Sequence, residues 1–167
     1  QCTSGVPCFL PYNNVTRGQT AKIVASAAGL SDAIPNTQQT FQDVPVSNSF
    51  WLFIERMASH GYISGYPCGG PNEPCGTGNK PYFRWGNNVT RAQLAKIVVS
   101  AQQWTFDTSG GPHFLDVPTT DPFYGYIETA YHHNIISGYS DGTFRPGNNA
   151  TRGQISKIVY SAITQLR

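Results

Sequence analysis

The sequence has little charge and no long apolar run. Only 12% of its 167 residues are charged, and the formal net charge is +2. Because the basic residues are spread out, we expect no nucleic-acid-binding surface. No stretch approaches the roughly 18 apolar residues of a membrane-spanning helix, so we also expect no transmembrane segment. The length suffices for a single domain, 1–167, with its own core.

The sequence starts without methionine, at Gln1, and shows no signal-peptide pattern. We interpret it as a processed or excised chain, although an artificial boundary would look the same. Cysteine is scarce, and its spacing is wider than that of zinc ligands and has no adjacent histidine. Disulfides are favoured, which predicts an oxidising, extracellular setting. Three connectivities are open, and we favour the local pairs Cys2–Cys8 and Cys68–Cys75.

Catalytic and metal-binding constellations are also missing. His132 and His133 are expected on different faces of one helix, and His60 and His113 lack matching partners, so we interpret all four as solvated or partly packed. No Ser-His-Asp or Cys-His set has the motif context of a catalytic site. We therefore predict no enzyme activity, no catalytic residue, no cofactor and no metal site.

Three acidic residues receive structural interpretations. Glu55 and Glu128 occupy equivalent positions of a repeat, so we expect them to contact arginine or backbone groups. Asp141 begins a segment that resembles a cation-binding loop. A lone aspartate supplies too few oxygens for calcium, and a tight turn is favoured instead.

What the sequence does contain is one segment in three copies. They read NNVTRGQTAKIV from Asn13, NNVTRAQLAKIV from Asn87 and NNATRGQISKIV from Asn148. In each copy a threonine stands at the expected N-cap and a glutamine follows three residues later, which is the capping-box pattern. We predict helices over 17–28, 91–104 and 152–166, capped by Thr16 with Gln19, Thr90 with Gln93 and Thr151 with Gln154.

Each cap is followed by an arginine and preceded by an asparagine. The helical wheel places Arg17, Arg91 and Arg152 at the edge of the apolar face. Two interpretations stay open: bonds to carboxylates or carbonyls that tie adjacent repeats together, or ligand binding. The asparagines form N-x-T sequons, for which we favour turn and capping geometry over glycosylation. They are Asn14, Asn88 and Asn149.

A second set of motifs occurs twice, at residue numbers that differ by 73 throughout. Phe41 to Tyr66 matches Phe114 to Tyr139, and the earlier copy is followed by 12 extra residues before Phe83. We predict helices over 49–60 and 122–133, the latter with Asp121 as N-cap and Pro122 at its first position. Units of this period pack on one another. The predicted fold is all-α, with a first half repeat at 1–29 and complete second and third repeats at 41–104 and 114–167.

These motifs together resemble the S-layer homology (SLH) family. The resemblance rests on F-x-D-V-P, I-S-G-Y, D-G-T-F-R-P and N-N-x-T-R-x-Q, and it covers nearly the whole chain. The NNVTRGQ wording and the cysteine-bearing loop are similar to repeats of Chloroflexota-type bacteria. The family's glutamate is replaced by glutamine at the capping positions, and the first repeat is cut in half.

The resemblance implies a pseudo-threefold helical array and a non-enzymatic protein at the extracellular cell surface. Such modules attach to cell-wall polysaccharide, often pyruvylated, in grooves between repeats. The resemblance assigns ligand contacts to the arginine after the cap, to an aromatic residue of the intervening helix and to the aspartate of the opening motif. These positions are Arg17, Arg91, Arg152, Trp51, Tyr124, Asp43 and Asp116.

The half repeat motivates an alternative function. The helix over 17–28 presents the apolar residues Thr20, Ile23, Val24 and Ala27, and the helix that would precede it is absent from the chain. Monomers usually avoid such an exposed stripe. A neighbouring chain that covered it head to tail would build a filament or layer. Alternatively, a helix of another repeat or the 30–40 linker covers it within one chain.

Overall fold

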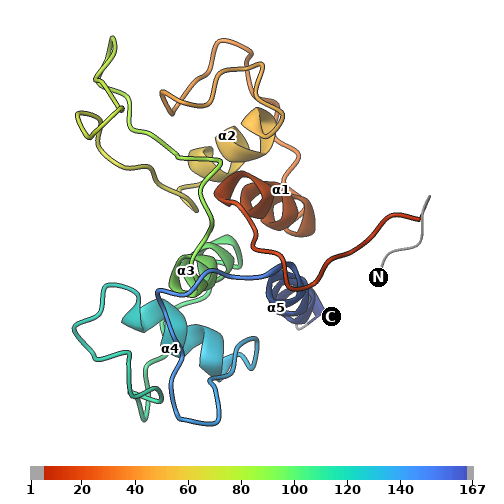
Figure 1. Cartoon of the computed structure of the whole chain (residues 1–167), viewed down its shortest axis with the longest axis vertical. Helices are drawn as coiled ribbons and strands as arrows, with labels where there is room; N and C mark the ends of the chain where they lie inside the picture. The colour runs from red at the N-terminus through yellow and green to blue at the C-terminus, as the bar shows by residue number, and fades with distance from the viewer. Residues whose placement is uncertain (1–5, 165–167) are drawn as a thin grey trace.

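The structure is a computed structural model that describes residues 6–164. Its helices are α1 (Arg17–Ala27), α2 (Trp51–Ser59), α3 (Arg91–Ala101), α4 (Tyr124–His132) and α5 (Arg152–Thr164), joined by long loops (Figure 1). Isolated β-bridges occur between 14 and 151, 16 and 88, and 90 and 149, but the described residues form no strand. The all-α class is confirmed. No described helix is long and apolar enough to cross a membrane.

The predicted capping boxes are present at α1, α3 and α5. At α1 the backbone N–H of Gln19 donates to Thr16 Oγ1 (3.3 Å), and the backbone N–H of Thr16 donates to Gln19 Oε1 (3.1 Å). The same reciprocal bonds join residues 90 and 93, and 151 and 154. At the other end of α1, Gly29 adopts φ +68°, where glycine is favoured.

Two predicted helix boundaries are wrong. Helix α3 ends at Ala101, short of residue 104, because Gln103 adopts φ +53° and the backbone leaves the helix. Asp121 is not the N-cap of α4, which is Phe123. The Asp121 carboxylate instead accepts from the Phe123 N–H (2.7 Å) and its carbonyl from the Tyr124 N–H (2.9 Å), which makes a turn before the helix.

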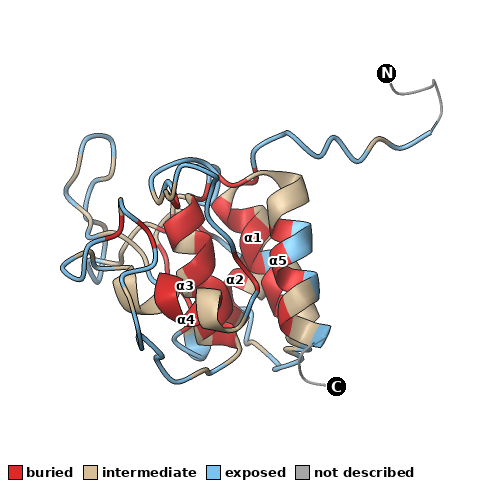
Figure 2. Ribbon diagram, turned by 90° about the horizontal axis from the view of Figure 1, so that it is seen from below, coloured by how far each residue is buried: buried red, intermediate tan, exposed pale blue. Residues whose placement is uncertain are grey.

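The three copies of the repeated segment meet in a closed cycle of backbone hydrogen bonds. Val15 N donates to Ala150 O (3.0 Å), Ala150 N to Val89 O (2.9 Å), and Val89 N to Val15 O (2.9 Å). All three side chains are buried. Around this cycle α1, α3 and α5 pack on one another (Figure 1), and their inward faces are the most buried part of the molecule (Figure 2).

The packing of α1 corrects the expectation of an exposed stripe. Helix α2 packs on α1, and α4 packs on α3. Thr20 and Val24 are buried, while Ile23 and Ala27 are partly buried against the core. Helices α1 and α3 are thus each covered by the helix that follows in sequence, whereas α5 packs on α1 and α3. The apolar stripe of α1 is thus covered within the chain, so the physical reason for expecting a second chain there is removed.

Candidate ligand-binding grooves

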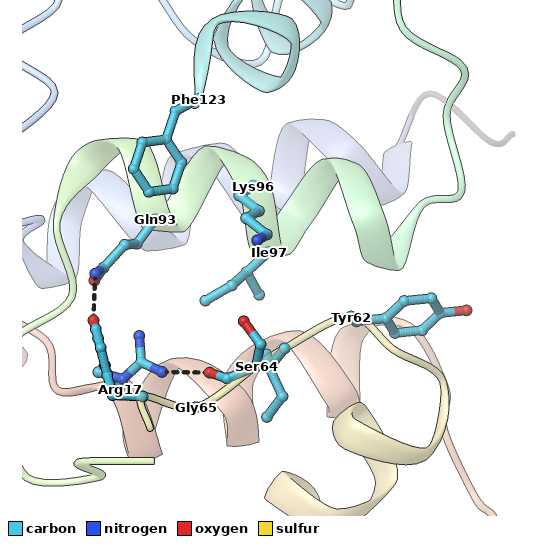
Figure 3. Close-up of a pocket in the computed structure, with 10 residues that line it drawn as sticks. Arg17, Tyr62, Ser64, Gly65, Gln93, Lys96, Ile97 and Phe123 are labelled. Carbon is cyan, nitrogen blue, oxygen red and sulfur yellow. Dashed lines mark hydrogen bonds between the residues drawn. The ribbon is translucent and has the colours of Figure 1, made fainter. Parts of the chain in front are cut away.

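Two hollows with equivalent linings lie between successive repeats. Groove one, between the first and second repeats, has a volume of about 350 Å³, and groove two, between the second and third, about 180 Å³. Groove one is lined by Arg17, 62–66, Gln93, Lys96, Ile97 and Phe123 (Figure 3), and groove two by Arg91, 135–139, Gln154, Lys157 and Ile158. Each groove therefore contains an arginine, a serine, a tyrosine, a glutamine and a lysine at equivalent positions of the repeats.

The arginine of groove one is held by carbonyls of the second repeat. Arg17 Nε donates to Phe83 O (2.7 Å), and a terminal nitrogen donates to Ser64 O (3.0 Å; Figure 3). Its guanidinium carbon lies 4.4 Å from the ring centroid of Phe83 and 5.1 Å from that of Tyr66. Burial lowers the pKa of Arg17 below its ordinary value, although the nearby Tyr66 and Asp43 oppose this. Arg17 thus ties adjacent repeats together, as one interpretation expected.

The other two arginines repeat this contact around the cycle. Arg91 Nε donates to Phe144 O (2.8 Å), and burial likewise lowers its pKa. Arg152 Nε donates to Phe9 O (2.6 Å), which closes the cycle from the third repeat to the first. Arg152 lines neither groove. Its partner Phe9 is 51% exposed, whereas Phe83 is fully buried, so the third position of the cycle is less complete.

The aspartates of the opening motif fix the same phenylalanines from the other side. The Asp43 carboxylate accepts from Phe83 N (2.7 Å) and Arg84 N (2.6 Å), and Asp116 accepts from the equivalent groups of residues 144 and 145 (both 2.7 Å). Both oxygens of each carboxylate are engaged by backbone N–H groups. Neither aspartate lines groove one or groove two, and each carboxylate instead holds the backbone of the adjoining phenylalanine and arginine in position.

The aromatic residues carried over from the family lie elsewhere. Trp51 is buried, and its indole N–H donates to Gln38 O (2.9 Å). Tyr124 is half-buried and packs against the core. Neither lines groove one or groove two, because Trp51 contacts the preceding loop at Gln38 and Tyr124 contacts it at Gly111. The aromatic residue common to both grooves is the tyrosine of the I-S-G-Y motif, Tyr66 or Tyr139, which sequence reasoning did not assign to the site. Groove one is also lined by Tyr62 and Phe123.

Each groove tyrosine is covered by a second arginine that pairs with a carboxylate. The guanidinium carbon of Arg84 lies 4.0 Å from the Tyr66 ring centroid, and that of Arg145 lies 3.9 Å from Tyr139. Glu73 accepts two bonds from Arg84 (both 2.8 Å), which raises the pKa of this arginine. Glu73 belongs to the 12-residue insertion, which therefore supplies the carboxylate that Asp141 supplies in the third repeat.

The insertion is closed by the predicted disulfide Cys68–Cys75, whose Cα atoms are 5.0 Å apart. The other predicted pair, Cys2–Cys8, falls partly outside the described residues, because Cys2 is not among them. The sequon asparagines Asn14, Asn88 and Asn149 are exposed, and the threonine of each sequon caps a helix as expected. Glycosylation stays a prediction.

Asp141 is expected to titrate with a pKa of about 2, lowered from 3.8 by bonds from the Thr143 hydroxyl (2.6 Å), the Arg145 guanidinium (2.9 Å) and the Thr143 N–H. Because the folded-state pKa is the lower one, Asp141 favours folding fully above pH 3.8. That contribution is lost as pH falls to about 2. NMR titration of the carboxyl carbon measures the pKa directly. The Thr143→Val variant should titrate closer to 3.8, and an unchanged pKa would contradict the assigned cause.

Two further groups reach the grooves from the repeated helices. Gln93 Oε1 accepts from Thr90 N (3.2 Å) while its Nε2 donates to the Tyr66 hydroxyl (2.9 Å), so the capping glutamine also fixes the groove tyrosine. Lys96 lines the same groove. The sequence could have indicated both residues, because a lysine follows the capping glutamine by three positions at 93 and 96 and again at 154 and 157. A Cβ on Gly65 would lie 2.8 Å from Tyr82 O, which requires glycine in the wall.

Part of the chain matches a known domain family, and most of it is similar to known proteins. Residues 113–155 match the S-layer homology domain. Cell surface glycoprotein 1 of Acetivibrio thermocellus is 26% identical over 93% of the chain, the middle cell wall protein of Brevibacillus brevis 25% over 90%, and the cellulosome-anchoring protein of Acetivibrio thermocellus 25% over 78%. The chain spans 7%, 13% and 26% of these relatives. The chain thus contains an S-layer homology domain at residues 113–155, and it is similar to cell-surface and cell-wall proteins over most of its length.

Proposed function

We propose that this chain is a non-enzymatic, extracellular cell-surface module that binds an acidic cell-wall polysaccharide in grooves one and two. The duplicated set of arginine, lysine, glutamine and tyrosine carries the proposal. Each groove presents a cation next to an aromatic ring, and this pair suits an acidic sugar. The cationic groups attract the acid, and the ring face packs against the apolar side of a pyranose.

The repeat arrangement supports this function. We propose that the cycle through Val15, Val89 and Ala150 makes the chain a pseudo-threefold array of SLH repeats, with the first repeat at 1–29 and the others at 41–104 and 114–167. The array places two grooves with the same polar set between successive repeats. A polymer with a repeating acidic unit could occupy both grooves, and linked binding would strengthen the attachment.

The lysines provide the sharpest test, because the arginines also support the fold. Lys96 and Lys157 line the two grooves, while Lys22 holds the same position of the repeated segment in α1 and lines neither. We expect Lys96→Ala with Lys157→Ala to weaken binding to isolated cell-wall polymer by roughly 10- to 100-fold, since each lost charge contact is worth about 1 kcal/mol or more.

Binding is measured by co-sedimentation with cell walls and by calorimetry with the released polymer. Lys22→Ala is the matched control and should bind like the wild type. The melting temperature of every variant is recorded, so that loss of folding is separated from loss of contact. Equal binding by the double variant and the wild type, or no binding by either, would contradict the proposal.

A further inference from the structure

A cluster of three ligating side chains lies away from both grooves, beneath the loop that leads into the third repeat. His113 Nδ1 lies 2.5 Å from Glu128 Oε2, and the rings of His113 and His132 are 5.2 Å apart in an edge-to-face arrangement. Ligand atoms of His113, Glu128 and His132 all lie within 4.8 Å of one another. Glu128 is fully buried, while the two histidine side chains are 25% and 24% exposed.

This cluster corrects the expectation that His113 lacks a partner. The loop before Phe114 folds back onto α4, where Glu128 and His132 are four residues apart and share one face of the helix. His133 points to another face, as expected, and stacks on Trp104 with ring centroids 3.7 Å apart. Glu128 also accepts the backbone N–H of His113 (3.1 Å), which confirms the predicted backbone contact of this glutamate.

The second repeat shows what the fold needs at this place. There, Glu55 is equally buried and accepts the backbone N–H (2.8 Å) and hydroxyl (2.7 Å) of Thr40. Thr40 and Ser59 occupy the positions of His113 and His132, 73 residues earlier. The Gln38 amide also donates to Glu55 (3.0 Å), so one hydroxyl and one amide bind this buried carboxylate without an imidazole. Imidazoles at these two positions are therefore not a general requirement of the repeat.

We propose that His113, Glu128 and His132 form a binding site for a divalent transition metal ion, with Zn²⁺ as the preferred ion. Two neutral imidazoles and one carboxylate are a ligand set that Zn²⁺ accepts, and water occupies the remaining position of such sites. Asp107 is close enough to serve as a further ligand, since its Oδ1 lies 3.8 Å from His132 Nε2. Solvent reaches the site past the two imidazole rings, whose side chains are about a quarter exposed.

Metal binding requires two local rearrangements. His132 Nε2 now lies 2.9 Å from Ser109 O, and this contact must be released. The ligand atoms must also reach separations of roughly 3.4 Å, which tetrahedral ligands about 2.1 Å from Zn²⁺ require. The His113 Nδ1–Glu128 Oε2 pair must therefore open from 2.5 Å, and the longer separations, which are within 4.8 Å, must shorten. Rotation of the two partly exposed imidazoles accomplishes both changes without moving buried Glu128. A bound cation would neutralise that buried carboxylate.

Calorimetric titration of the disulfide-intact chain with ZnCl₂, in a buffer without chelating groups, tests the proposal. We expect one equivalent bound with a Kd of about 1 μM or tighter, and a rise in melting temperature on saturation. His113→Thr and His132→Ser, which install the residues of the second repeat, should each weaken binding at least tenfold. His133→Ala is the matched control and should bind normally.

NMR provides a readout that does not depend on any variant. Zn²⁺ should shift the imidazole resonances of His113 and His132 in the wild-type chain and leave those of His60 unchanged. His60 pairs with exposed Asp32 (2.9 Å) and offers the competing location. Absence of binding heat, binding that persists in the His113→Thr, His132→Ser double variant, or shifts confined to His60 would each overturn the proposal.

Discussion

Replacement of Phe83 by alanine is expected to lower the free energy of unfolding by about 4 kcal/mol, the usual range for a buried phenylalanine. Phe83 is fully buried, and its ring centroid lies 5.1 Å from that of Phe41. Its carbonyl accepts a hydrogen bond from Arg17, and its N–H donates one to Asp43. The truncation leaves a cavity beneath the guanidinium of Arg17. Urea-induced unfolding followed by far-ultraviolet circular dichroism measures the change.

The chain supplies matched controls for this substitution. Phe144 occupies the same place in the third repeat, is 1% exposed and contacts Arg91 in the same way. Phe144→Ala should therefore cost about as much as Phe83→Ala. Phe9 accepts the equivalent bond from Arg152 but is 51% exposed, so Phe9→Ala should cost less than about 1 kcal/mol. Equal losses of stability at positions 9 and 83 would contradict the conclusion that the Arg152–Phe9 contact is the less complete one.

Replacement of Asp43 by alanine is expected to cost about 3 kcal/mol. Its carboxylate accepts the N–H groups of Phe83 and Arg84, and a buried donor left without its partner costs about 1–3 kcal/mol. Phe83 is buried, so its N–H has no ready access to water, whereas the loss at Arg84 is softened by partial exposure. Chemical denaturation gives the magnitude.

Two further variants isolate the role of Asp43. Asp43→Asn keeps one acceptor oxygen and should recover about half of the loss. Asp116→Ala removes the same two bonds in the third repeat, at Phe144 and Arg145, and should cost about as much as Asp43→Ala. If Asp43→Ala were as stable as the wild type but failed to bind cell-wall polymer, the aspartate would contact ligand, as the family resemblance implied, and the positioning role would be wrong.

The candidate site was predictable only in part. The helical wheel located Arg17, Arg91 and Arg152 correctly at the edge of a buried face, because that property depends on the 3.6-residue period alone. It could not say that each guanidinium faces a phenylalanine carbonyl of another repeat. Trp51 and Asp43 entered the predicted site through resemblance, and the structure shows both occupied by backbone contacts. Lys96, Gln93 and Tyr66 were not assigned to the site, because they lie far in sequence from Arg17, the arginine of the same groove.

The sequence by itself determined the local structure of this protein. The capping boxes, the glycine that ends α1 and the equivalence of the repeats depend on groups within a few positions of one another, where chain connectivity restricts the choices. Tertiary structure alone decided what those elements contact. Arg152 reaches Phe9 across 143 positions, α2 covers α1, and His113 meets Glu128 because a loop folds back on α4. Those contacts follow from closing the chain into a cycle that buries Val15, Val89 and Ala150 together, a condition that no single segment encodes.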